Sequence, residues 1–306
     1  MKADGSRPRV SIVVPTFARP ALLPRAIASV LEQTFQDFEL LVVDDASPKS
    51  AEDALTAFSD QRLKVVRHRS NRGSAAARNT GIRLARGELV AFLDDDDNAL
   101  PGWLQATADV FATAPPRVGY AWCGVRDVQA MPDGTRITLR ERRWEHFRDS
   151  EPPAMAPNVL ATGYGLVVRA CCFDHVGLFD ESLRACVDVD FLLRLALRFD
   201  YAVVPEILIE VSHHELGQLT DPSRQRAEAY ERILEKHGQP LSHLPALRLS
   251  LQRKLALLRY QTGERSRGRR ALLAALGGPD RLGTLRRLVA YELGRGGART
   301  RREARR

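Results

Sequence analysis

The hydrophobic pattern of the first hundred residues alternates between two periods. Four short apolar runs rich in β-branched residues predict buried strands at 9–15, 38–45, 62–69 and 88–93. The stretches between and after them carry apolar residues at helical spacing and predict helices over 21–34, 51–59, 74–87 and 101–114. Strands alternating with helices favour an α/β fold with a mostly parallel sheet, which binds its ligands beyond the carboxyl ends of the strands.

The pattern after residue 115 is less regular. It predicts a hairpin of residues 118–129 and 135–141, a proline-rich loop over 142–158, a strand at 160–169, a helix at 186–199 and a strand at 201–215. From about Asp221 onward only helical patterns follow, and they indicate three to four helices. We therefore expect a mixed, mostly parallel sheet flanked by helices in residues 1–220, and a helical region in 221–306.

Composition is typical of a soluble globular protein, with 44% hydrophobic and 27% charged residues. There is no apolar run long enough for a membrane helix, and the first residues lack the features of a signal peptide. Four cysteines without a CxxC pair favour a reducing cytoplasm. The net charge of +8 is uneven, because residues 264–306 hold 13 arginines and four acids, so the rest of the chain is near neutral. This distribution argues against a nucleic-acid-binding surface.

Polar groups gather where three of the predicted strands end. Pro15-Thr16 and Asp44-Asp45 close the first two, and four consecutive aspartates, Asp94 to Asp97, follow the fourth. Acids at one strand end serve as caps, as general acids or bases, or as ligands for hard cations such as Mg²⁺ and Mn²⁺. Adjacent carboxylates repel each other unless a cation offsets them, which favours a metal–diphosphate site. The P-loop and dinucleotide glycine signatures are both missing from the sequence.

The motifs VSIVVPTFARP, FELLVVDDAS and NRGSAAARNTGIRLARGELVAFLDDDD occur in an order and spacing that resembles the inverting glycosyltransferases of family 2, which have the GT-A fold. The resemblance extends from about Arg9 to Thr220. It implies an enzyme that moves a sugar from a nucleotide-diphosphate donor to an acceptor, assisted by Mn²⁺ or Mg²⁺. The acceptor, a glycan, a lipid-linked glycan or another hydroxyl compound, is left open, and polysaccharide biosynthesis is the expected setting.

The same resemblance implies roles for individual residues. Pro15 and Thr16 would line the nucleotide pocket, Asp45 would accept a hydrogen bond from the base, and Arg78 would lie near the nucleotide and the acids. Either Asp94 or Asp95 would face the ribose. Asp96 would ligate the metal, with His214 as a further metal ligand. Asp97 and Asn98 are interpreted as caps for the helix that follows.

An inverting transfer also needs a base that accepts the acceptor's proton. In the resembled family this base is an aspartate at the start of a helix, usually preceded by glutamate. The segment VDVDFLLRLAL matches with Asp188 as the base, although Val187 replaces the glutamate. Asp190 is the rival for this role, and in a third interpretation both acids only complement the helix dipole. Trp144 is a candidate for contact with the acceptor.

Other functions remain open at this point. A sugar-nucleotidyltransferase would share a similar sheet, and a catalytically inactive glycan-binding or scaffold homologue would keep the fold without the activity. The C-terminal segment places Leu285, Leu288, Val289 and Leu293 on one side of a predicted helix, beside Arg286 and Arg287. This arrangement indicates either peripheral contact with anionic membrane at its cytoplasmic face or a solvated basic end.

Overall fold

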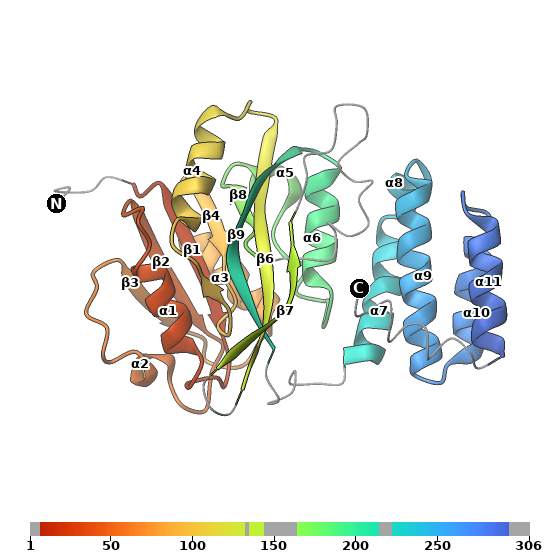
Figure 1. Ribbon diagram of the computed structural model, residues 1–306, viewed down its shortest axis with the longest axis horizontal. Helices are drawn as coiled ribbons and strands as arrows, with labels where there is room; N and C mark the ends of the chain where they lie inside the picture. The colour runs from red at the N-terminus through yellow and green to blue at the C-terminus, as the bar shows by residue number, and fades with distance from the viewer. Residues whose placement is uncertain (1–6, 132–134, 144–163, 214–221, 294–306) are drawn as a thin grey trace. The chain divides into compact units, whose positions relative to one another are not determined.

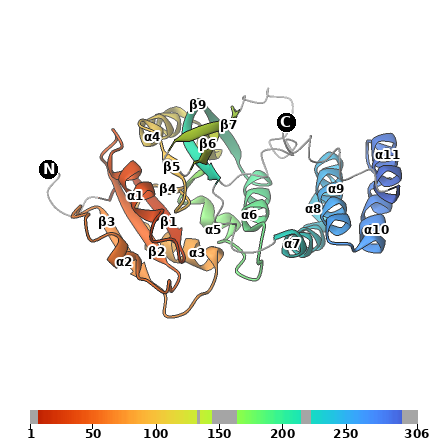
Figure 2. The ribbon, with the colours of Figure 1, turned by 60° about the horizontal axis from the view of Figure 1, so that its bottom comes forward.

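The computed structural model describes residues 7–131, 135–143, 164–213 and 222–293. These residues form two compact units, of which the first contains the sheet (Figures 1 and 2). Residues 182–186 belong with 222–293 in the second unit, and the other described residues make up the first. The boundary predicted between residues 220 and 221 lies outside the described part of the chain.

The amino-terminal half of the sheet is parallel, as its pattern predicts. Strands β1 (Val10–Thr16), β2 (Phe38–Asp44), β3 (Leu63–Arg67) and β4 (Leu89–Phe92) lie in the order β3-β2-β1-β4. All positions of β1, β2 and β4 are buried. Both faces of this part of the sheet are therefore covered, which explains why these strands are continuous apolar runs and do not alternate with polar residues.

The two faces of β1 contact different helices, because successive side chains of a strand point in opposite directions. Ile12 and Val14 belong to the core cluster that contains the apolar side of α1 (Leu23–Leu31). Val13 faces α3 (Ser74–Leu84), where a Cβ atom added to Gly81 would lie 2.3 Å from the Val13 side chain. Glycine at position 81 thus permits close packing of helix and sheet.

The second half of the sheet adds antiparallel pairs. Beyond β4 follow β8 (Val167–Arg169), β6 (Val118–Ala130), β9 (Asp200–His213) and the two-residue β5 (Asn98–Ala99), and β7 (Arg136–Arg142) forms the predicted hairpin with β6. The pairs β4–β8, β8–β6 and β5–β9 are antiparallel, whereas β6–β9 is parallel. The expectation of a mixed sheet is confirmed.

The remaining helices of the first unit are α2 (Ala51–Ala54), α4 (Trp103–Thr113), α5 (Cys172–Val176) and α6 (Val187–Ala196). Three of them follow the predicted pattern with shorter bounds, whereas the short α5 was not predicted. Trp103 is fully buried and belongs to the core. The predicted capping role of Asp97 and Asn98 is wrong, because Gly102 is the capping residue of α4. Asn98 belongs to β5 and pairs there with Glu210 of β9.

The second unit contains five helices in its described residues, against the three to four that were expected. They are α7 (Pro222–Lys236), α8 (Gly238–Ser242), α9 (Pro245–Gln261), α10 (Arg265–Ala275) and α11 (Arg281–Glu292). Ala256, Leu272 and Tyr291 form a small core that joins α9, α10 and α11. None of the helices described is both long and apolar enough to cross a membrane.

Candidate active site

The carboxyl ends of β1, β2 and β4 meet at one edge of the sheet and bring the predicted polar residues together. Thr16 is paired with Asp44 at the ends of β1 and β2. Its hydroxyl donates a hydrogen bond of 2.6 Å to the Asp95 carboxylate, and its carbonyl accepts one from the backbone N–H of Asp45. Pro15 is buried within β1 beside them. Thus Thr16, Asp45 and Asp95 form one connected group.

The two loops that follow β1 and β2 have strained backbones at this edge. Ala18 and Ala46 adopt φ angles of 55° and 63°, in the left-handed region that residues other than glycine seldom occupy. Ser47 joins the loops, because its hydroxyl accepts a bond from the N–H of Ala18 and its own N–H donates to Asp44. Such strain persists only where neighbouring contacts hold the conformation, and it is common in binding sites.

The four aspartates after β4 have different surroundings. Asp94 lies 2.5 Å from the guanidinium of Arg78, and Asp95 and Asp96 share the guanidinium of Arg19 at 2.9 and 2.6 Å. The Asp94 side chain is the most exposed of these three acids, at 36%. Hence Arg19 joins Asp95 and Asp96, whereas Asp94 has a separate partner in Arg78.

The fourth aspartate of the run, Asp97, is buried. Its carboxylate accepts a hydrogen bond of 3.1 Å from the backbone N–H of Ser212 in β9. Arg25 of α1 bridges the same place, since it donates to the carbonyl of Asp96 and to the hydroxyl of Ser212. We call residues Asp94 to Asp97 the acidic run. Asp97 anchors this run to the second half of the sheet.

The arginines do not cancel the negative charge of the acidic run. Burial raises the pKa of Asp95 to about 6, despite the hydrogen bond from Thr16 and the charge of Arg19. Burial also raises the pKa of Asp97 well above its ordinary value, and the charges of Asp94 and Asp96 add to the effect. Raised carboxyl pKa values mean that the site favours additional positive charge.

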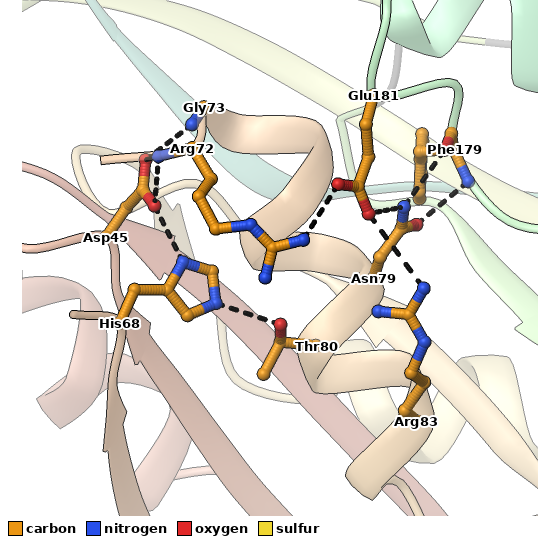
Figure 3. Close-up of polar contacts among 9 residues, drawn as sticks. All are labelled: Asp45, His68, Arg72, Gly73, Asn79, Thr80, Arg83, Phe179 and Glu181. Atoms are coloured by element: carbon orange, nitrogen blue, oxygen red, sulfur yellow. Dashed lines mark hydrogen bonds and ion pairs between the residues drawn. The ribbon is translucent and has the colours of Figure 1, made fainter. Parts of the chain in front are cut away.

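Asp45 has a different environment, shown in Figure 3. Its carboxylate accepts hydrogen bonds from the backbone N–H groups of Arg72 and Gly73, at 2.9 and 2.7 Å, and lies 2.7 Å from Nδ1 of His68. The other ring nitrogen of His68 is 2.8 Å from the hydroxyl of Thr80. Asp45 thus organises the loop before α3, and its predicted contact with a nucleotide base remains a prediction.

The two acids of α6 have separate surroundings. Asp190 is fully buried and accepts two hydrogen bonds, of 3.0 and 2.8 Å, from Arg194 one turn further along. Asp188 keeps some exposed surface. Burial raises the pKa of Asp188, the charge of Arg78 offsets part of that rise, and Asp94 adds to it. Asp188 therefore interacts electrostatically with Arg78 and with Asp94 of the acidic run.

The segment before Asp188 is held by side chains from two helices. Asn79 of α3 bonds both the N–H and the carbonyl of Phe179, each at 2.9 Å, and donates to Glu181 (Figure 3). Arg194 of α6 donates to the carbonyl of Leu178 at 2.8 Å and to that of Val176. Glu181 in turn pairs with Arg72. Since Arg78 precedes Asn79 in the chain, this network links the positions of Arg78 and α6.

Several residues of this site were missed by sequence reasoning. Arg19 and His68 contact the predicted acids directly. Asp97, Asp94 and Asp188 add to burial in raising the pKa of Tyr164, so this tyrosine also belongs to the site. A basic residue just after the first strand was the available signal for Arg19, whereas His68 and Tyr164 carry no comparable signal.

The predicted histidine ligand lies outside the described residues, as does Trp144. The preceding His213 is half exposed, and its Nε2 atom is 3.2 Å from Asp127. Asp127 also pairs with Arg140 and Arg142 of β7. His213 is therefore engaged at the hairpin.

The acidic run has the donor chemistry that a divalent cation needs. Mg²⁺ and Mn²⁺ prefer oxygen ligands, and Mg²⁺ commonly takes one or two carboxylates and leaves its other positions to water and substrate phosphates. Among the described residues, no group of three or more His, Cys, Asp or Glu side chains is placed so that it could hold a metal ion. Asp94 and Asp96, in a site with raised carboxyl pKa values, fit a metal that is shared with a diphosphate.

Comparison with known proteins identifies the family of the chain. The chain matches the family model for glycosyl transferase family 2 over residues 11–163, half of its length, and it belongs to this family. The glycosyltransferase YwdF of Bacillus subtilis is 27% identical over 240 residues, which cover 78% of this chain and 86% of YwdF.

A shorter match has a more specific name. It is WfgD of Escherichia coli, a UDP-Glc:α-D-GlcNAc-diphosphoundecaprenol β-1,3-glucosyltransferase, 41% identical over 88 residues that cover 29% of this chain and 35% of WfgD.

Among solved structures, S. aureus TarS 1–349 in complex with UDP-GlcNAc is similar with a TM-score of 0.62 and 17% identity. The match covers 94% of this chain and 89% of TarS. It confirms the expected GT-A fold. The chain is therefore a family 2 glycosyltransferase with a GT-A-type catalytic unit and C-terminal helices.

Proposed function

We propose that this enzyme transfers a sugar from a nucleoside-diphosphate donor to a hydroxyl group by a metal-assisted, inverting single displacement. The observation that carries the proposal is the convergence of Asp188, Arg78 and Asp94 at the carboxyl edge of the sheet. One carboxyl group is thereby available as a base beside a separate acidic group suited to a metal–diphosphate.

Asp188 is the proposed base. It accepts the proton of the acceptor hydroxyl while the oxygen forms a bond to the anomeric carbon. The bond from that carbon to the diphosphate breaks at the same time, and the diphosphate keeps the electron pair. A carboxyl with a raised pKa is better matched to this proton transfer than an ordinary aspartate.

Asp96 is the proposed metal ligand, with Asp94 or Asp95 toward the ribose. Mg²⁺ or Mn²⁺, when bound, supplies positive charge for the leaving diphosphate. Arg19 orients Asp95 and Asp96, and Arg78 orients Asp94. Pro15, Thr16 and Asp45 are proposed to line the nucleotide side.

For the substrates, we propose a UDP-sugar and a lipid-linked or polysaccharide acceptor, at the cytoplasmic side of the membrane. WfgD supports both choices, since its name specifies UDP-Glc and a diphosphoundecaprenol acceptor. The UDP-GlcNAc complex of TarS also supports the donor class.

The test is a donor screen with the full chain in Mn²⁺ or Mg²⁺, starting with UDP-sugars and including GDP- and dTDP-sugars. Release of nucleoside diphosphate identifies the donor, and mass spectrometry identifies the glycosylated acceptor. Proton NMR of the product then reports the anomeric configuration, for which we expect inversion relative to the donor. Retention of configuration, or full turnover in excess EDTA, would contradict the proposed mechanism.

A further inference from the structure

Helix α11 of the second unit has one packed side and one apolar side that faces solvent. Thr284 and Tyr291 are buried, and Leu288 packs against the small core with α9 and α10. Leu288 therefore does not belong to the exposed face, where the sequence pattern placed it. The residues of the outer side are between 47% and 72% exposed: Leu282, Leu285, Val289 and Leu293. We call these four residues the α11 stripe.

The α11 stripe is bordered by positive charge on both edges. With 100° per residue, its four side chains fall within a narrow sector of the helix. Arg281 lies on one side of this sector and Arg286 on the other, and both are exposed. Arginine can lay its apolar stem along such a surface while its guanidinium reaches outward.

The acids near the stripe are already paired within the unit. Asp280 accepts a hydrogen bond from Arg253 at 2.8 Å, and Glu292 pairs with Arg269 at 2.9 Å. In the sequence, residues 294–306 add six arginines and one acid directly after the stripe. The surface around α11 is thus apolar in its centre and cationic at its border.

The apolar centre and the cationic border together indicate which kind of surface could cover the α11 stripe. Two copies of α11 related by a two-fold axis would bring the same arginine borders together, and like charges repel. An anionic lipid surface supplies both requirements at once, because its head groups pair with arginine and its acyl boundary accepts leucine and valine side chains.

We propose that the α11 stripe docks this enzyme reversibly on an anionic membrane surface. Neither the nucleotide-sugar chemistry nor the identity of the acceptor is needed for this interaction. An amphipathic helix with an adjoining basic segment is sufficient for peripheral binding. The proposal therefore goes beyond glycosyl transfer, and it is tested without any measurement of turnover.

The experiment is co-sedimentation of the full chain with vesicles of phosphatidylcholine alone or of phosphatidylcholine and phosphatidylglycerol. We expect binding to the anionic vesicles only. The double variant Leu282→Ser, Val289→Ser should bind at least about tenfold more weakly, since two apolar anchors are lost. Leu139→Ser is the control, because Leu139 on β7 of the other unit is 52% exposed, close to Val289 at 49%, and its substitution should leave vesicle binding unchanged.

Two further variants separate the stripe from the basic residues after it. Leu285→Trp should show a blue shift of its fluorescence with anionic vesicles, which reports transfer of position 285 into the acyl boundary. A chain ending at Gly294 should keep part of its binding and the sensitivity to the serine variant. Unchanged binding of the serine variant, or no shift at position 285, would overturn the proposal.

Light scattering of the same proteins tests whether a second copy of the chain, and not a lipid surface, covers the α11 stripe. If the serine variant changes the mass in solution from a dimer to a monomer and binds vesicles like the unmodified chain, the stripe is an interface between copies. We expect the mass to be unaffected by the substitutions.

Discussion

The two units each contain clusters of arginines and acids, and the clusters differ in how their charge is balanced. In the helical unit Arg259 is 1% exposed, and its guanidinium bonds Glu231 and Glu264. Partial burial opposes ionisation of Glu264, but hydrogen bonds from Arg267 and Arg259 outweigh it and lower its pKa. In the acidic run burial raises the pKa of Asp95 to about 6, although the charge of Arg19 opposes the rise.

The comparison shows that ion pairs by themselves do not indicate a function. In the Arg259 cluster hydrogen bonds lower the pKa of Glu264, whereas in the acidic run burial raises the pKa values of Asp95 and Asp97. Acids whose pKa is raised by burial beside other charged groups are candidates for a functional site. Substitutions in both clusters test this distinction.

The largest expected effect is that of Asp96→Asn. If Asp96 holds the metal, the variant should lose metal-dependent turnover and keep its fold, because asparagine fits the same space without the charge. Turnover is measured over a Mn²⁺ titration, and circular dichroism checks the fold. Normal activity at ordinary Mn²⁺ concentrations would show that Arg19 alone balances this carboxylate.

Asp188→Asn follows, with an expected loss of roughly 10²–10⁴ in kcat for a positioned base. Affinity for the donor, measured by calorimetry, should be unchanged, since Asp188 acts on the acceptor. Asp190→Asn is the matched control on the same helix. It should lower the free energy of unfolding, because Arg194 loses its buried partner. The reverse result would assign the base to Asp190.

Asp95→Asn tests the raised pKa itself. A carboxyl with a higher pKa in the folded than in the unfolded state binds more protons when folded, so its ionisation lowers stability as pH rises. Without metal, the free energy of unfolding of Asp95→Asn should rise by about 3 kcal/mol relative to that of the unmodified chain as the pH goes from about 4 to about 7. Urea unfolding in EDTA measures this difference. A difference independent of pH would mean that Asp95 is ionised like an ordinary surface acid.

Arg259→Met tests the cluster of Arg259, Glu231 and Glu264. We expect a loss of about 2 kcal/mol in the free energy of unfolding, since hydrogen bonds to two charged partners disappear while the glutamates regain water. The folded variant should keep the kcat of the unmodified enzyme. A selective fall in kcat with unchanged stability would assign this cluster to function.

The smallest effect is expected for Asn79→Ala, which removes the hydrogen bonds of this side chain with Phe179 and Glu181. We expect a fall of about tenfold in kcat, with donor affinity retained, because the segment before Asp188 loses one of its two attachments. The pH profile of kcat should also shift if Asp188 moves relative to Arg78. A loss of stability alone would limit Asn79 to a structural role.

Much of the architecture could be predicted from local sequence. The four parallel strands, the β6–β7 hairpin and α6 follow from apolar periodicity, which depends on residues near each other in the chain. The two-residue β5 was not predictable, because it exists only through pairing of Asn98 and Ala99 with Glu210 and Ile209. The same long-range contact buries Asp97 against Ser212, which no capping pattern indicates.

By itself, the sequence determined the family, the strand ends that carry acids and the candidate acids on α6. These properties depend on residue type and spacing. Tertiary structure decided which aspartates of the acidic run share counter-charge, since Arg19 and Arg78 lie far from them in the chain. The Asp190–Arg194 pair is local to α6, but the influence of Arg78 on Asp188 and the packing of Leu288 against α9 and α10 depend on the fold. Burial, and pairing between distant residues, arise only when distant segments pack, because both depend on water excluded by the whole fold.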